Sequence, residues 1–145
     1  MTLSAILCPL DFSSASVPVV AYAAALAAAT GAELRLVHVL EPQPVLAQPD
    51  ASPELNVPGQ LAAHQATAER AGARVKTVIL EGDAAVEIVA EARRHPADLI
   101  VIGAHGQTGL TRFLMGNTAE VVVRTAPCAT LLVKAGPADE YRQSA

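Results

Sequence analysis

Short apolar runs alternate with alanine-rich segments of helical length along almost the whole chain. The runs predict five strands, at Ser4–Pro9, Glu33–Leu40, Arg74–Leu80, Asp98–Ile102 and Cys128–Lys134. The segments between them predict four helices, at Ala15–Thr30, Gln60–Ala71, Ala84–Arg94 and Arg112–Thr125. Since crossovers between parallel strands are right-handed, this alternation predicts an α/β fold, a doubly wound parallel sheet with helices on both faces.

Size and composition narrow the function classes. The 145 residues are most simply one domain, expected over residues 1–135, with a flexible tail over 136–145. A net charge of −4 argues against a nucleic-acid binder that works through a basic face. No apolar stretch reaches the roughly 18 residues of a membrane span, and the start lacks a basic signal-peptide region, so we expect a cytoplasmic protein that does not insert into membranes.

Three glycines follow the buried strand that ends at Ile102. Gly103, Gly106 and Gly116 lie between the carboxyl end of that strand and the start of the next helix. Ligands of open parallel sheets bind at such a place, where the free N–H groups and the dipole of a helix start favour an anion. Glycine lets the backbone approach a phosphate without a Cβ in the way. The loop therefore predicts a nucleotide phosphate site; the alternative is a tight connection with no ligand.

The chain resembles the universal stress protein family, in its nucleotide-binding branch. That branch carries Gly, two residues, Gly, nine residues, then Gly followed by Ser or Thr; Gly103, Gly106 and Gly116 keep the spacing, with Asn117 in the Ser/Thr position. The resemblance implies a five-stranded sheet of order 3-2-1-4-5, as in adenine-nucleotide α-hydrolase-like domains. It runs over nearly all of residues 4–134 and rests on Ile6-Leu7-Cys8-Pro9-Leu10-Asp11-Phe12-Ser13, Gly31-Ala32-Glu33-Leu34, Val37-His38-Val39, Ala97-Asp98-Leu99-Ile100-Val101-Ile102-Gly103 and Thr125-Ala126-Pro127-Cys128-Ala129-Thr130-Leu131-Leu132-Val133.

The resemblance also implies a ligand, ATP, which a Mg²⁺ ion can accompany, and a set of residues around it. Family members are typically homodimers that pair through the last strand, here Cys128–Lys134, and an apolar edge strand needs such a cover. For Asp11, a ligand role and a helix cap are both open, and His105 is expected to donate a hydrogen bond near phosphate. The implied residues are Pro9, Leu10, Asp11 and Val39 around adenine and ribose, Ile102 and Gly103 beneath the ribose, and Gly106, Gly116, Asn117 and Thr118 at the phosphates.

Three functions compete on this basis. The preferred hypothesis is an ATP-binding stress-response protein that acts as a homodimeric switch with little or no hydrolysis, since the sequence shows no Walker lysine, catalytic base or metal-binding carboxylate pair. The second is a nucleotide-free dimeric scaffold or regulator of a partner such as a transporter, which Asn117 keeps open. A distant third is an adenylating or pyrophosphate-releasing enzyme, whose Ser-Gly-Gly-x-Asp-Ser or His-x-Gly-His motifs are absent from the sequence.

The cysteines and histidines predict no metal or redox centre. Cys8 and Cys128 fall in predicted strands separated by a third, about 10 Å apart, which is beyond the reach of a disulfide. We therefore expect buried thiols. His38 is expected to be a satisfied core or edge residue, and His64 and His95 to lie at surface helix positions. The spacing of these residues matches no metal-ligand pattern.

Overall fold

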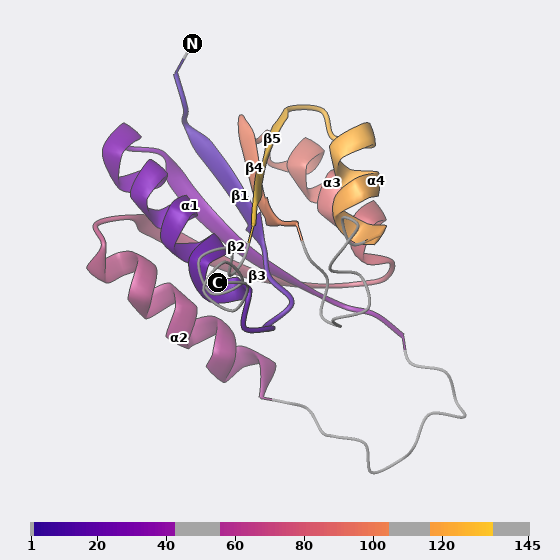
Figure 1. Ribbon diagram of the computed structural model, residues 1–145, viewed down its shortest axis with the longest axis horizontal. Coiled ribbons are helices and arrows are strands. Elements are labelled where there is room, and N and C mark those ends of the chain that lie inside the picture. The colour runs from indigo at the N-terminus through magenta and orange to yellow at the C-terminus, as the bar shows by residue number, and fades with distance from the viewer. Residues whose placement is uncertain (1, 43–55, 105–116, 135–145) are drawn as a thin grey trace, which may run out of the picture.

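The computed structural model describes residues 2–42, 56–104 and 117–134, which form one parallel sheet between two layers of helices (Figure 1). The strand order is β3-β2-β1-β4-β5, so the predicted doubly wound sheet of order 3-2-1-4-5 is confirmed. The strands are β1 (Ala5–Pro9), β2 (Glu33–Leu40), β3 (Arg74–Glu81), β4 (Leu99–Gly103) and β5 (Ala129–Val133). The described helices are α1 (Ser16–Thr30), α2 (Val57–Arg70), α3 (Ala84–Arg94) and α4 (Asn117–Thr125).

Alternate residues of each strand feed two separate cores, one on each face of the sheet. In β1, Ile6 and Cys8 pack with α1 and α2, whereas Leu7 packs with α3 and α4. In β4, Val101 faces the first layer and Ile100 the second. Because the central strands are covered on both faces, their sequences are continuous apolar runs rather than alternating ones.

The first helix is apolar nearly all round and is closed by a glycine. Alanine has the highest helix propensity, which favours a helix where 15 residues carry no charge. Gly31 ends it with φ of 79°, and its N–H donates to the carbonyl of Ala27 at 2.9 Å. Only glycine adopts this left-handed conformation without strain, so the predicted end of α1 at Thr30 is confirmed.

The second helix begins three residues earlier than predicted. Asn56 is its N-cap, and the side-chain Oδ1 accepts a hydrogen bond from the Gly59 N–H at 3.2 Å. Pro58 lies in the first turn, where its missing N–H and fixed φ are tolerated. The predicted start at Gln60 leaves Pro58 outside the helix, because the many prolines among residues 41–58 are typical of a loop.

Other differences from the predicted bounds amount to single residues at element ends. Cys128 is one of them: it precedes β5 and is half-buried, so the expectation of a buried strand thiol is wrong for this residue. For α4, the stretch before Asn117 lies outside the described residues, as does the predicted tail over 136–145. Across the described part of the chain, no helix combines the length and apolar character that crossing a membrane requires.

Candidate functional site

The two central strands part from one another along their carboxyl halves. Between β1 and β4 only two residue pairs are in register, Ile6 with Leu99 and Leu7 with Ile100. By contrast, β2 and β3 share eight pairs, and β4 and β5 share five. The chain turns to opposite sides after these two strands, to β2 from β1 and to β5 from β4. This is the topological switch point, where open α/β sheets hold their ligands.

A proline accounts for the parting of the strands. The backbone polar groups of a strand point alternately to its two neighbours. Leu10 N–H donates to β2, at the Val37 carbonyl 2.8 Å away, and the Ala5 carbonyl accepts from the Asp98 N–H, at the entrance to β4. Position 9 therefore faces β4, and Pro9 has no N–H to donate there. After β4 the backbone bonds to β5 on the side away from β1: the Ala104 N–H donates to the Val133 carbonyl at 2.9 Å.

The loop after β1 is organised by Asp11. Its Oδ1 accepts hydrogen bonds from the Ser13 N–H at 2.9 Å and from the Ser16 hydroxyl at 3.3 Å. The N-cap residue of α1 is Ala15, which makes no side-chain cap hydrogen bond. The Asp11 carboxylate therefore holds the loop that leads to α1 and contacts the first residue of that helix through the Ser16 hydroxyl. Its predicted ligand role stays a prediction.

Phe12, in the loop between β1 and α1, has a left-handed backbone conformation with φ of 63°. Its ring stacks on His38 with centroids 4.3 Å apart and lies parallel to His64 at 6.1 Å. The Nδ1 atom of His38 lies 2.8 Å from the Leu10 carbonyl, so the prediction of a satisfied histidine is confirmed. His64 is half-buried against this stack rather than at the surface, and burial lowers the pKa of its imidazole.

Six of the predicted site residues lie at one edge of the sheet. Pro9 ends β1, and Leu10 and Asp11 follow it. Val39 lies near the end of β2, and Ile102 and Gly103 end β4. Ile102 is buried, whereas Val39, Asp11 and Gly103 are half-buried.

The predicted phosphate-binding residues divide into two groups. Asn117 and Thr118 begin α4, which runs from the carboxyl edge back toward the start of β5 (Figure 1). Asn117 is exposed and Thr118 is half-buried. His105, Gly106 and Gly116 lie outside the described residues.

A neighbouring helix start at the same edge is already closed by carboxylates. The Asp83 side chain caps α3 by accepting from the Val86 N–H at 3.1 Å, and the Glu41 carboxylate accepts from the Ala84 N–H at 3.0 Å. Their negative charge excludes an anion from the N-terminus of α3.

The sequence predicts two buried thiols and no metal centre. Cys8 and Cys128 are both free, and burial raises the pKa of each thiol, with the Asp98 carboxylate raising that of Cys128 further. A thiol that stays protonated is a poor nucleophile. Within the described ranges, no three His, Cys, Asp or Glu side chains form a group able to hold a metal ion.

Comparisons with known proteins identify the family that has this fold. A match to the universal stress protein family spans residues 3–134. The chain belongs to the universal stress protein family. Universal stress protein MJ0531 of Methanocaldococcus jannaschii is 36% identical over 137 residues, which cover 89% of this chain and 81% of the relative.

Two solved structures of universal stress proteins share the architecture. One, in complex with cAMP, has a TM-score of 0.74 at 24% identity and covers 92% of this chain and 98% of its own. The other, from Archaeoglobus fulgidus in complex with dAMP, has a TM-score of 0.71 at 23% identity and covers 92% and 100%. At these identities the likeness shows the fold alone.

Two features of this universal stress protein were missed by sequence reasoning. The Phe12 stack joins residues from a loop, a strand and a helix, and no spacing rule links positions 12, 38 and 64. The sequence motifs assign no role to Arg35, although its position in β2 points it to the same face as Val37, among the buried side chains. A charge at an inward position of an apolar strand was the signal that could have found it.

Proposed function

We propose that this universal stress protein binds ATP in the crevice between β1 and β4 and acts as a homodimeric regulatory switch in the cytoplasm, with little or no hydrolysis. The adenine and ribose would lie against Pro9, Leu10, Asp11 and Val39, with Ile102 and Gly103 beneath the ribose. The phosphates, with or without Mg²⁺, would meet the residues from His105 to Thr118. Binding would shift the population of the dimer between two states that partners distinguish.

The observation that carries this proposal is the parting of β1 and β4 at the switch point. Pro9 leaves one side of the crevice without a ladder hydrogen bond, so the strand ends are held by β2 and β5 instead. The glycine spacing that begins at Gly103 follows directly from one wall of this crevice. Universal stress proteins of the same fold carry cAMP and dAMP, which supports an adenine nucleotide as the ligand class.

Calorimetric titration with ATP, ADP, AMP and cAMP tests the proposal. We expect saturable ATP binding in the parent chain and its loss in Gly106→Val, because the new side chain occupies the space that the motif reserves for phosphate. Ala62→Val, at an exposed position of α2, is the matched control and should bind as the parent does. No heat and no thermal stabilisation at millimolar ATP would leave the nucleotide-free scaffold as the function.

Asn117 tests whether a side chain at the start of α4 contacts the phosphates of the proposed ligand. Its amide can donate to a phosphate oxygen, as the hydroxyl of the family pattern does, and removing it in Asn117→Ala should weaken ATP binding by about 1 kcal/mol. Asn117→Ser restores the family residue and should retain affinity. An unchanged affinity in Asn117→Ala would assign the side chain to the helix start only.

Dimerisation is proposed through β5. Of the described strands, β5 ends one side of the sheet, and Ala129 and Leu131 are exposed on it. An apolar edge strand of this kind pairs readily with another strand. Leu131→Lys should shift the protein from dimer to monomer in light scattering, and a dimer that persists would place the contact elsewhere.

A further inference from the structure

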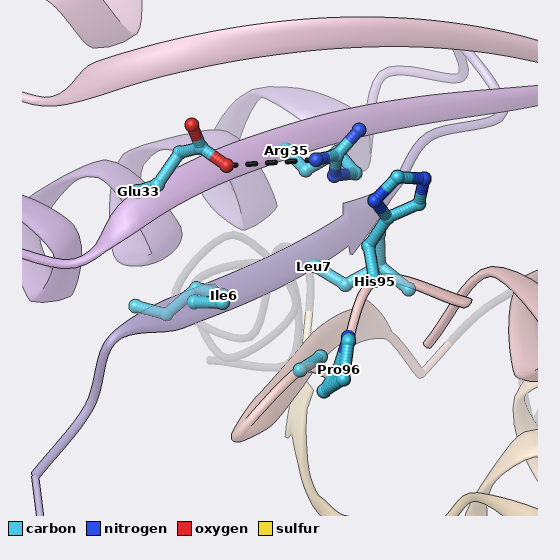
Figure 2. A pocket seen from close by; sticks show the side chains of 8 residues that line it. Ile6, Leu7, Glu33, Arg35, His95 and Pro96 are labelled. Carbon is cyan, nitrogen blue, oxygen red and sulfur yellow. Dashed lines mark ion pairs between the residues drawn. The ribbon is translucent and has the colours of Figure 1, made fainter. Parts of the chain in front are cut away.

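A pocket lies at the amino edge of the sheet, opposite the crevice between β1 and β4. It has a volume of about 230 Å³ and is formed where β1 and β2 begin and where the chain enters β4 (Figure 2). This volume is below the roughly 300–1,000 Å³ of sites for drug-sized ligands, so an occupant is small. The pocket is lined by Ala5, Ile6, Leu7, Glu33, Arg35, His95, Pro96 and Ala97.

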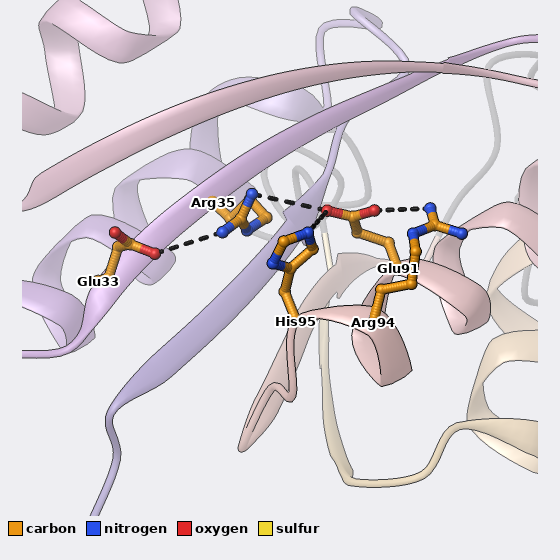
Figure 3. Close-up of polar contacts among 5 residues, drawn as sticks. All are labelled: Glu33, Arg35, Glu91, Arg94 and His95. Atoms are coloured by element: carbon orange, nitrogen blue, oxygen red, sulfur yellow. Dashed lines mark hydrogen bonds and ion pairs between the residues drawn. The ribbon is translucent and has the colours of Figure 1, made fainter.

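A buried carboxylate next to the pocket is satisfied mainly by one arginine. Glu91 of α3 is 3% exposed, and its Oε1 lies 2.7 Å from Nη2 of Arg94, a short charge-assisted hydrogen bond. Its Oε2 lies 3.6 Å from Arg35 and 3.9 Å from His95. Figure 3 shows the carboxylate between Arg94 on one side and these two groups on the other. The two longer distances exceed hydrogen-bonding geometry.

Arg35 therefore has donor capacity that the described residues do not use. Its other ion pair, with Glu33, is also 3.6 Å long, and within the described part of the chain the guanidinium makes ion pairs but no hydrogen bond. The side chain is only 18% exposed, so water reaches few of its five N–H groups. In Figure 2 the guanidinium and the His95 ring lie together at one end of the pocket.

We propose that this pocket binds a small monocarboxylate with a short hydrocarbon chain. The planar guanidinium matches a carboxylate with two parallel hydrogen bonds, and the imidazole of His95 supplies a further donor. Leu7, Pro96 and Ala97 provide apolar surface for the chain of the ligand. Glu33 and Glu91 balance the charges of Arg35 and Arg94, which keeps the local charge near neutral and disfavours a dianion such as phosphate against a single charge.

This proposal is independent of the nucleotide site. The pocket lies at the start of the strands, whereas the nucleotide crevice lies at their carboxyl ends. Among the described residues, Pro9 and Gly103 are not part of its lining. Binding of a carboxylate and binding of ATP are therefore separate measurements, and the failure of one leaves the other standing.

The test uses the full chain labelled with ¹⁵N and titrated with propionate in a buffer free of carboxylates. We expect saturable shifts of the Ile6, Leu7 and Ala97 amides in the tens-of-millimolar range or below. Arg35→Gln should weaken binding by about tenfold or more, since it removes the paired donors. Arg93→Gln, an exposed charge on the same helix as Glu91, is the matched control and should bind as the parent does.

Two further comparisons keep the result decisive. Ala5→Val fills the pocket with a residue that suits a strand and touches no charge, so it should abolish the shifts even if Arg35→Gln fails to fold. Propionamide, which has the same shape without the charge, should bind at least several-fold more weakly. Absence of saturable shifts, equal binding of propionamide, or tighter binding of inorganic phosphate would each overturn the proposal.

Discussion

The two ends of this sheet hold sites of opposite construction. At the carboxyl edge, β1 and β4 part, because the Pro9 position that faces β4 has no N–H, and the six site residues at the strand ends are apolar or glycine apart from Asp11. At the amino edge the same strands are paired, and the Asp98 carboxylate accepts from the Ser4 and Ala5 N–H groups at 2.7 and 3.0 Å. There the polar groups are charged side chains from β2, α3 and the turn before β4.

This difference teaches how each site is tied to the stability of the fold. The strand ends at the carboxyl edge lack a ladder hydrogen bond, and Asp11 is the one charged residue among the six site residues there, so most of them can change with little cost to folding. Beside the amino-edge pocket, Arg35 and Glu91 are opposite charges where water is scarce. Removing either one takes an ion-pair partner from the other, although Glu33 stays beside Arg35 and Arg94 stays beside Glu91. Substitutions at the two edges should therefore separate ligand binding from folding.

The largest effect is expected from Glu91→Leu. The substitution removes one of the two carboxylates beside the mostly buried Arg35 and leaves Glu33, 3.6 Å away, as its ion-pair partner, so we expect a loss of about 1–3 kcal/mol in the free energy of unfolding. Urea denaturation measures the loss. Affinity for ATP at the carboxyl edge should stay unchanged in the fraction that is folded.

The double variant Glu91→Leu with Arg35→Leu is the control for that loss. It removes both charges, so most of the stability should return, as is common when a buried ion pair is replaced by apolar groups. A single variant as stable as the parent would show that Arg35 finds water or another partner. The comparison between the two edges would then lose its energetic basis.

The sequence predicted the carboxyl edge far better than the amino edge. Gly103 and the apolar run before it are local signals, since periodicity marks the strand and chain reversal at the switch point fixes the place of a ligand. Pro9 was expected at the site, but its effect on the ladder depends on which neighbour each N–H faces, and this follows from register. The register becomes visible only once β1 is paired on both sides.

The amino-edge pocket could not be predicted because its residues share no spacing. Arg35 and the group from Glu91 to His95 are more than 50 positions apart, and they meet only after α3 packs against β2. The cap of α2 shows a local version of the same difficulty. The predicted start at Gln60 leaves Asn56 outside the helix, although the Asn56 side chain caps its first turn.

The second expected effect concerns Pro9→Ala, which restores an N–H toward β4. We expect this amide to find a carbonyl of β4, to gain protection from hydrogen exchange, and to draw the strand ends together by one ladder bond. The narrower crevice should lower ATP affinity several-fold. Pro18→Ala is the matched control, because Pro18 lies in the first turn of α1, where no N–H is needed.

In Pro9→Ala, the amide at position 9 could exchange its hydrogen as fast as a free amide while ATP affinity stays unchanged. That result would contradict this account of the crevice. The free energy of unfolding is the weaker readout here. The added hydrogen bond and the greater freedom of the unfolded chain without proline act in opposite directions, each by about 1 kcal/mol or less.

The smallest expected effect is a pH dependence carried by His64 at the carboxyl edge. Burial against Phe12 lowers the pKa of the folded imidazole below its ordinary value, so the unfolded chain takes up a proton first as the pH falls. This contribution to stability is fully present above the unfolded pKa, and it is lost as the pH falls toward the folded pKa. His64→Gln should therefore flatten the fall in melting temperature between neutral and mildly acidic pH.

The size of this effect stays well under about 1 kcal/mol, because the ring is only partly buried and water screens the added charge. Gln65→Ala, a neighbouring change on α2 that removes no titrating group, should keep the slope of the parent protein. An equal slope in His64→Gln and the parent would show that the ring takes its proton as readily in the folded chain as in the unfolded one. In that case the contact with Phe12 would not change the affinity of the imidazole for a proton.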